Sequence, residues 1–104
     1  MGEDEMNISK FTVNVTNEDI YMKYIYELES TIYKDDKVYG IKIEREDTKD
    51  GKVIRKIENK VSIISKNKEL VESLLKLLYN NQVSPIHLVD IIGETVDNCV
   101  SEFK

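Results

Sequence analysis

The sequence is poor in several residue types, and each shortage restricts what the protein can be. It has one cysteine, one proline, one histidine, four glycines and no tryptophan among 104 residues. The single Cys99 excludes a disulfide within the chain, and no apolar run approaches the roughly 18 residues that a membrane-spanning helix needs. No apolar signal segment is recognisable near the start. We therefore expect a cytoplasmic protein with no membrane partner.

Positive charge is also scarce. The only arginines are Arg45 and Arg55, and the net charge is −5. Residues 1–52 carry 13 acidic and 8 basic side chains, whereas residues 53–104 carry seven of each. Proteins that bind nucleic acids neutralise phosphates with a basic face, and arginine makes the bidentate contacts to phosphate and guanine. We therefore expect no nucleic-acid partner.

The remaining composition is that of one small globular domain. The chain is 40% hydrophobic and 34% charged, and a chain of this length buries roughly two-thirds of the surface that it exposes when unfolded. The acidic start leads us to interpret residues 1–7 as a disordered tail. Residues 8–104 then form a single α+β domain.

Alternating apolar and polar side chains predict strands in the first half. Residues 11–15 have the strict alternation of a half-buried strand. Residues 21–33 fit a helical stripe as well as a strand, and their tyrosine, isoleucine and threonine content favours the strand. Residues 39–43 and 53–63 then complete a four-stranded antiparallel meander.

The connection between the third and fourth strands predicts a register. A three-residue loop, Lys49-Asp50-Gly51, puts Gly51 where a left-handed residue is needed. Apolar side chains then face apolar ones, and acidic side chains face basic ones. The predicted pairs are Ile43 with Ile57, Tyr39 with Val61, Glu44 with Lys56, and Lys42 with Glu58. A two-residue turn at Asp50-Gly51 would instead set Ile43 against Glu58, so we prefer the longer loop.

The second half has the 3.6-residue period of helices. We expect a helix over residues 68–80 with Ser65 or Asn67 as its N-cap, and its wide apolar arc must contact both the sheet and a neighbour. The Ser84-Pro85 pair predicts the N-cap and first residue of a second helix that continues to residue 103. Four residues are expected in one core: Leu74, Leu88, Ile92 and Phe103. The predicted fold is thus α+β, a four-stranded antiparallel meander followed by two C-terminal helices packed on one face.

Two groups of residues are candidates for function. The first would point away from the helices, and as a contiguous apolar patch it would mark an interface for a partner or a homodimer. Its members are Tyr21, Ile25, Tyr33, Val38 and Ile54. The second is the corner between the helices, at His87 and Asp90.

The corner allows more than one interpretation. With Glu94 and Asp97, His87 and Asp90 lie along one flank of the second helix and could hold a divalent metal. The same pattern is typical of a solvated acidic face, and His87 fits a structural role at the corner. No nucleophile or orienting partner for His87 is recognisable. We therefore assign no catalytic residue, no cofactor and no metal.

Three short segments also carry a resemblance: Tyr39-Gly40-Ile41-Lys42-Ile43, Leu74-Leu75, and Pro85-x-His87-Leu88-x-x-Ile91-Ile92. Through them, most of residues 8–103 resembles a family of small uncharacterised proteins, a domain of unknown function, from low-GC, spore-forming anaerobic bacteria. The resemblance implies a bacterial, cytoplasmic setting and points to no particular activity. We expect a non-enzymatic protein that acts through protein–protein interaction in a regulatory role, with an unknown protein or itself as partner. The alternative is a small-ligand or metal-binding domain, or a minor enzyme, centred on His87.

Overall fold

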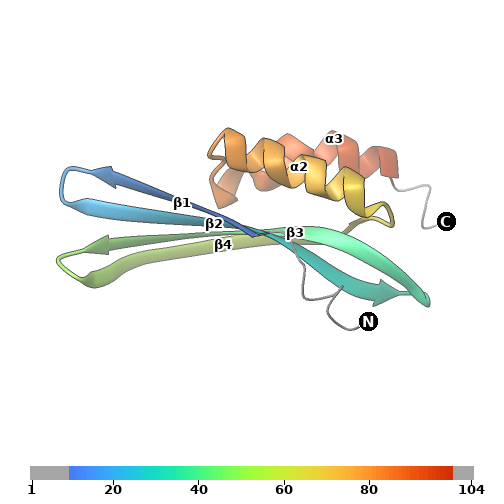
Figure 1. The fold of residues 1–104 in the computed structure, drawn as a ribbon, viewed down its shortest axis with the longest axis horizontal. Helices are drawn as coiled ribbons and strands as arrows, with labels where there is room; N and C mark the ends of the chain where they lie inside the picture. Colours follow the sequence, from blue (N-terminus) through green and yellow to red (C-terminus); the bar gives the residue numbers. More distant parts are fainter. Residues whose placement is uncertain (1–9, 100–104) are drawn as a thin grey trace.

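The alternating first half forms a sheet, and the helical second half lies on one face of it (Figure 1). The computed structural model describes residues 10–99. Its strands follow one another across the sheet, each antiparallel to the next: β1 (Lys10–Asn17), β2 (Ile20–Tyr33), β3 (Asp36–Lys49) and β4 (Lys52–Ser65). They are followed by α2 (Lys68–Asn80), the 3₁₀ turn η1 (Pro85–His87) and α3 (Leu88–Cys99). The predicted α+β meander with two C-terminal helices is confirmed, and residues 20–33 are a strand.

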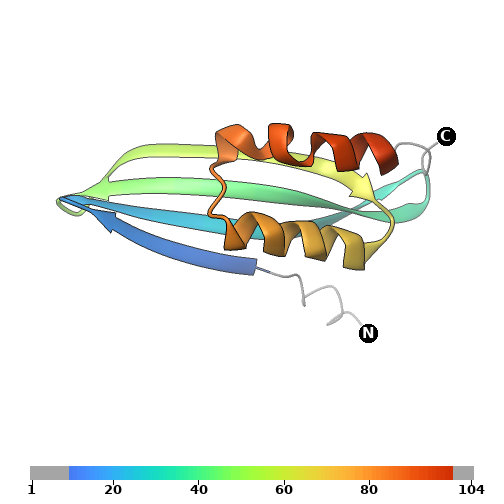
Figure 2. The same cartoon turned by 90° about the horizontal axis from the view of Figure 1, so that it is seen from above.

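The helices cover only one half of the sheet, as Figure 2 shows from above. The three long strands have 14 residues each and α2 has 13. At about 3.3 Å per strand residue and about 1.5 Å per helical residue, the strands are more than twice as long as either helix. The β1–β2 and β3–β4 hairpin ends therefore extend beyond the helix layer. We call this part the bare half of the sheet.

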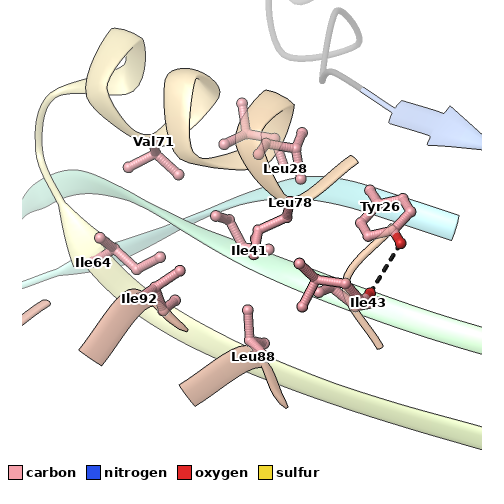
Figure 3. Packing of buried hydrophobic residues seen from close by; sticks show 11 residues of the cluster. Tyr26, Leu28, Ile41, Ile43, Ile64, Val71, Leu78, Leu88 and Ile92 are labelled. Carbon is pink, nitrogen blue, oxygen red and sulfur yellow. Dashed lines mark hydrogen bonds between the residues drawn. The ribbon is translucent and has the colours of Figure 1, made fainter. Parts of the chain in front are cut away.

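The core fills the space between the helices and the covered half of the sheet (Figure 3). Its buried side chains come from β2, β3, β4, both helices and the link between them: Tyr26, Leu28, Ile41, Ile43, Ile64, Val71, Leu75, Leu78, Val83, Leu88 and Ile92. Leu74 packs against this cluster. The predicted shared core is thus confirmed for Leu74, Leu88 and Ile92. Phe103 and the predicted tail at residues 1–7 lie outside the described residues.

The turn between β3 and β4 differs from the predicted three-residue loop. Lys49 pairs with Lys52, so Asp50 and Gly51 form a two-residue turn with φ of 52° and 77°. Such positive angles at both positions are those of the type I′ turn that Asp-Gly favours. The prediction was wrong because it assumed an uninterrupted ladder. A β-bulge at Ile54 follows the turn and moves the register by one residue.

Beyond this bulge the register differs from the predicted one by two residues. Ile43 lies opposite Asn59 instead of Ile57. A shift by an even number of residues keeps every side chain on its predicted face. Lys42 also still reaches its predicted partner Glu58, now diagonally, with 3.3 Å between Nζ and the carboxylate.

A second irregularity lies at the other end of the same strand pair. Ile41 lies opposite Val61, but Tyr39 lies opposite Ser65, where the sequence predicted Val61. Between these two pairs β3 has one residue, Gly40, whereas β4 has three. The β4 strand thus has two additional residues opposite Gly40. Additional residues in one strand bend it and increase its twist.

Replacing Gly51 with alanine is expected to lower the free energy of unfolding by about 1 kcal/mol, because a Cβ is strained at positive φ. A Cβ at this position would meet no atom within 4 Å, so the loss would come from the backbone conformation alone. Urea unfolding of the two proteins would measure it. An unchanged midpoint would contradict the type I′ turn.

The start of α2 follows the prediction. Asn67 is the N-cap, and its Oδ1 accepts a hydrogen bond of 3.2 Å from the N–H of Leu70. The other candidate, Ser65, supports the cap, because its Oγ accepts from the N–H of Asn67 at 2.9 Å. Within residues 10–99, no helix is long and apolar enough to cross a membrane.

Candidate functional site

The five residues of the predicted outer surface lie at separate points of the sheet. Tyr21 and Ile54, near the ends of the two hairpins, are 44% and 55% exposed, and Ile25 and Tyr33 are half-buried. Val38 is fully buried, so its inclusion in an exposed surface was wrong. The irregular stretch of β4 lies against this end of β3, so the outer face is not the open, regular surface that the sequence suggested.

A row of charged side chains also divides this outer face. Lys23 of β2 lies opposite Glu46 of β3, which lies opposite Lys56 of β4. The row separates Tyr21 from Ile25, which are on the same face of β2. The predicted residues therefore do not form one continuous apolar patch, and their role in binding a partner stays a prediction.

A short ion-pair network lies in the middle of the outer face. Glu44 and Glu58 lie directly opposite one another, and like charges in that position are destabilising. Lys42 lies between them, with Nζ 2.9 Å from Glu44 and 3.3 Å from Glu58. Its hydrogen bond holds the pKa of the Glu44 carboxyl below its ordinary value. The lysine thus offsets the repulsion that the register creates.

A second polar cluster lies on the helix side of the bare half. The Arg45 guanidinium donates two hydrogen bonds to the Asp47 carboxylate, at 2.9 and 3.0 Å, and a third to Met22 Sδ at 3.4 Å. It also lies over the Tyr24 ring, 5.6 Å from its centroid. The hydrogen bond to Asp47 raises the pKa of Arg45 above its ordinary value. Asp47 is buried, and the bidentate pair compensates its charge, so this cluster is structural.

The predicted corner residues His87 and Asp90 are both exposed. His87 ends η1, and Asp90 lies in the first turn of α3. In the described part of the chain, no three His, Cys, Asp or Glu side chains lie close enough together to hold a metal ion. His87 and Asp90, with Glu94 and Asp97, are therefore not brought together as a ligand set.

His87 instead borders a hollow between the end of α2 and the start of α3. The hollow has a volume of about 510 Å³. Its lining residues are Leu77, Asn81, Gln82, Val83, Ser84, His87 and Ile91. Leu77 and Ile91 are 49% and 47% exposed, although both belong to the apolar pattern of their helices. We call this feature the corner hollow.

The end of α2 shapes one wall of the corner hollow. Gln82 donates its N–H to Tyr79 O at 3.1 Å, and Val83 donates to Leu78 O at 3.0 Å. These two bonds define a Schellman motif, which places the residue after the C-cap in the left-handed region. Gln82 occupies that position with φ of 49°. Glycine is the usual residue at this position, because a Cβ is strained in the left-handed region. The glutamine backbone conformation therefore costs about 1–2 kcal/mol of stability.

Two buried hydroxyl groups are found at the link between α2 and α3, which lines the corner hollow. The buried Tyr26 hydroxyl donates to Val83 O at 2.9 Å and ties the link between the helices to β2 (Figure 3). Burial raises the pKa of Tyr26, with a smaller effect from Tyr24, so the group stays a donor. Ser84 is the residue before η1, as predicted, but its side chain makes no capping bond. Its Oγ is buried and has no hydrogen-bond partner among the described residues.

Several features of the corner hollow were not found from the sequence. The wide apolar arc of residues 68–80 did indicate that α2 has more apolar surface than the sheet can cover, but we assigned the excess to the neighbouring helix. The segment Asn80-Asn81-Gln82 lacks the glycine that usually ends a helix, and this was an overlooked signal of strain. The unpartnered Ser84 hydroxyl has no sequence signature.

Comparison with curated proteins and with solved structures found no match. A family of unknown function, DUF6514, matches residues 6–98, which include every described element except the last residue of α3. This match confirms the resemblance to an uncharacterised family that the sequence suggested. The chain belongs to the family of unknown function DUF6514.

Proposed function

We propose that the protein is a small, non-enzymatic cytoplasmic protein that regulates a partner protein by binding it at the corner hollow. The observation that carries this proposal is the exposure of Leu77 and Ile91 on the walls of the corner hollow. Apolar side chains around a concave surface are typical of interface centres.

The corner hollow has a place for an apolar side chain of the partner. Such a side chain would remove Leu77 and Ile91 from water, at roughly 25 cal/mol per Å² of apolar surface buried. The strained Gln82 supports the same interpretation, since strained backbone is often retained at binding sites.

The lining also favours binding over catalysis. Ser84 and His87 are both present, but the seven lining residues include no carboxylate that would orient the imidazole. Asp90, the other residue of the predicted corner, is not among them. A serine nucleophile needs a base held by a third group, and this lining does not provide one.

A second candidate function is binding of a small ligand or metal centred on His87. The volume of about 510 Å³ favours it, because small-molecule sites commonly enclose roughly 300–1,000 Å³. A ligand would use the exposed His87 imidazole as a polar contact. Stabilisation of the purified protein by Zn²⁺, Mn²⁺ or a small-molecule library, lost in His87→Ala, would favour this candidate over the first.

Partner binding is expected to depend on the walls of the corner hollow. The tagged full chain would be crosslinked in cells that produce it naturally, and captured proteins would be quantified by mass spectrometry. Leu77→Asp and Ile91→Asp should each reduce capture of the partner at least about tenfold, because each puts a charge at the centre of an apolar contact. Both side chains are half exposed, so the fold should tolerate the changes.

Two control variants separate the hollow from the rest of the surface. Lys76→Asp introduces the same residue at an exposed neighbouring position of α2 that does not line the hollow, and capture should be unchanged. Gln82→Gly should raise the free energy of unfolding by about 1 kcal/mol while weakening capture. If Lys76→Asp and Leu77→Asp reduced capture of the partner to the same extent, the proposal would be contradicted.

A further inference from the structure

The outer edge of β4 pairs with no other strand among residues 10–99. The strand order places β4 at one edge of the sheet, and β4 has 14 residues, against eight in β1 at the other edge. Its first part lies in the bare half, where Figure 2 shows no helix above it. A long free edge is a template for another strand unless it is blocked.

The hydrogen bond of one backbone amide shows which groups of β4 point outward. The N–H of Lys60 donates to Asn59 Oδ1 at 2.9 Å, in an exposed position, so it is directed away from β3. Backbone groups of an edge strand alternate between its neighbour and solvent. Between the two irregularities, which is the interval from Arg55 to Val61, the ladder is regular. The backbone groups of Glu58 and Lys56 therefore also point outward.

We propose that two copies of the chain join through their β4 edges, antiparallel, with Ile57 opposite Ile57 of the other copy. In this register Lys56 of each copy lies opposite Glu58 of the other, so the interface has two such pairs. The outward backbone groups of these residues exchange hydrogen bonds. Opposite charges at directly paired positions are favourable. The occupant of this edge is thus a second copy of the same chain.

The neighbouring registers are less favourable for stated reasons. Moving the partner strand by two residues in one direction places Glu58 against Glu58, and in the other direction Lys56 against Lys56, and both repel. A shift by one residue pairs outward groups with inward groups. A larger shift would pair Glu58 with Lys60 of the other copy and would need the Lys60 N–H as a donor between the strands. That N–H already donates to Asn59 Oδ1 of its own chain.

The half-covered sheet leaves room for this arrangement. A two-fold axis through the Ile57 pair runs perpendicular to the sheet, so both helix layers lie on the same side. In each copy α3 runs beside the later part of β4, away from the bare half (Figure 2). The rotation therefore brings the α3 of one copy alongside the bare half of the other, where no helix lies. The surface occupied is separate from the corner hollow, so the proposed function does not depend on it.

Charge reversal tests the pairing in the purified full chain. Sedimentation equilibrium should show a species of twice the 12.1 kDa chain mass for the wild type. Lys56→Glu and Glu58→Lys should each weaken association roughly tenfold, because each replaces two attractive pairs by two repulsive ones. The double variant carrying both reversals should recover it. Lys76→Glu on the exposed face of α2 is the matched control and should leave association unchanged, and circular dichroism would confirm that every variant is folded.

Cysteine crosslinking tests the register. Under mild oxidation Ile57→Cys should form a covalent dimer, because the two-fold axis brings this residue opposite itself in a non-hydrogen-bonded pair with close Cβ atoms. Glu58→Cys should not crosslink, and neither should the wild type, whose Cys99 is buried. A monomeric wild type at high micromolar concentration would overturn the proposal. A dimer that ignores the charge reversals, or that crosslinks through Glu58→Cys in preference to Ile57→Cys, would overturn it as well.

Discussion

Replacing Gly40 with alanine is expected to lower the free energy of unfolding by about 3 kcal/mol or more, the upper range for overpacked sites. A Cβ on Gly40 would lie 2.2 Å from Val61 O and 2.3 Å from Ser62 O. Both obstacles are backbone atoms of β4, which cannot rotate away as a flexible side chain would. The strand pair would have to separate where β4 has its two additional residues. Thermal unfolding followed by circular dichroism should show a melting temperature lower by roughly 10 °C or more.

Gly93 provides the matched control for this experiment. It lies in α3, and a Cβ there would meet no atom within 4 Å. Gly93→Ala should therefore raise the free energy of unfolding by about 0.5–1 kcal/mol, since alanine is the better helix former. If Gly40→Ala left the melting temperature unchanged or raised it, as Gly93→Ala is expected to do, the close approach of β3 and β4 at Gly40 would be contradicted.

Replacing Leu88 with alanine is expected to cost about 2–5 kcal/mol, as for other truncations of fully buried leucines. Leu88 is the first residue of α3, is fully buried and belongs to the same cluster as Ile43 and Ile92. Its truncation would leave a cavity where the helix layer meets the middle of the sheet (Figure 3). Urea unfolding would measure the loss.

A substitution at the adjacent Val89 distinguishes the effect of burial from the effect of helix propensity. Its side chain is 55% exposed, so Val89→Ala should change the free energy of unfolding by no more than about 0.5 kcal/mol. Equal losses from the Leu88 and Val89 variants would show that the packing of α3 differs from the one described. A large loss from Leu88→Ala alone would support the arrangement of α3 against the sheet.

The unequal lengths of strands and helices shape the surface of this protein more than any single residue does. Strands of 14 residues cannot be covered along their length by helices of 12 and 13 residues. The bare half of the sheet and the corner hollow both result from this mismatch, because the link between α2 and α3 lies near the middle of the sheet (Figure 2). The corner hollow, and the room that the bare half leaves for the proposed pairing of β4 edges, therefore have one structural origin.

The sequence by itself determined the order and type of the elements. Strict alternation predicted β1, the 3.6-residue period and the Asn67 cap predicted α2, and Ser84-Pro85 predicted where the second helical segment begins. These features were predictable because each depends on neighbours within a few residues along the chain. In the regular interval of β4 from Arg55 to Val61 the predicted faces were also correct, since the error in the register there was two residues.

Only the tertiary structure decided the register and the functional surfaces. The bulge at Ile54 and the additional residues beside Gly40 depend on how β4 fits against β3, and no local pattern encodes that fit. The burial of Val38 and the exposure of Leu77 likewise depend on what lies across from them. Apolar periodicity indicates that a side chain can be buried, but whether it is buried depends on which distant segment reaches it, and here the helices end before the sheet does.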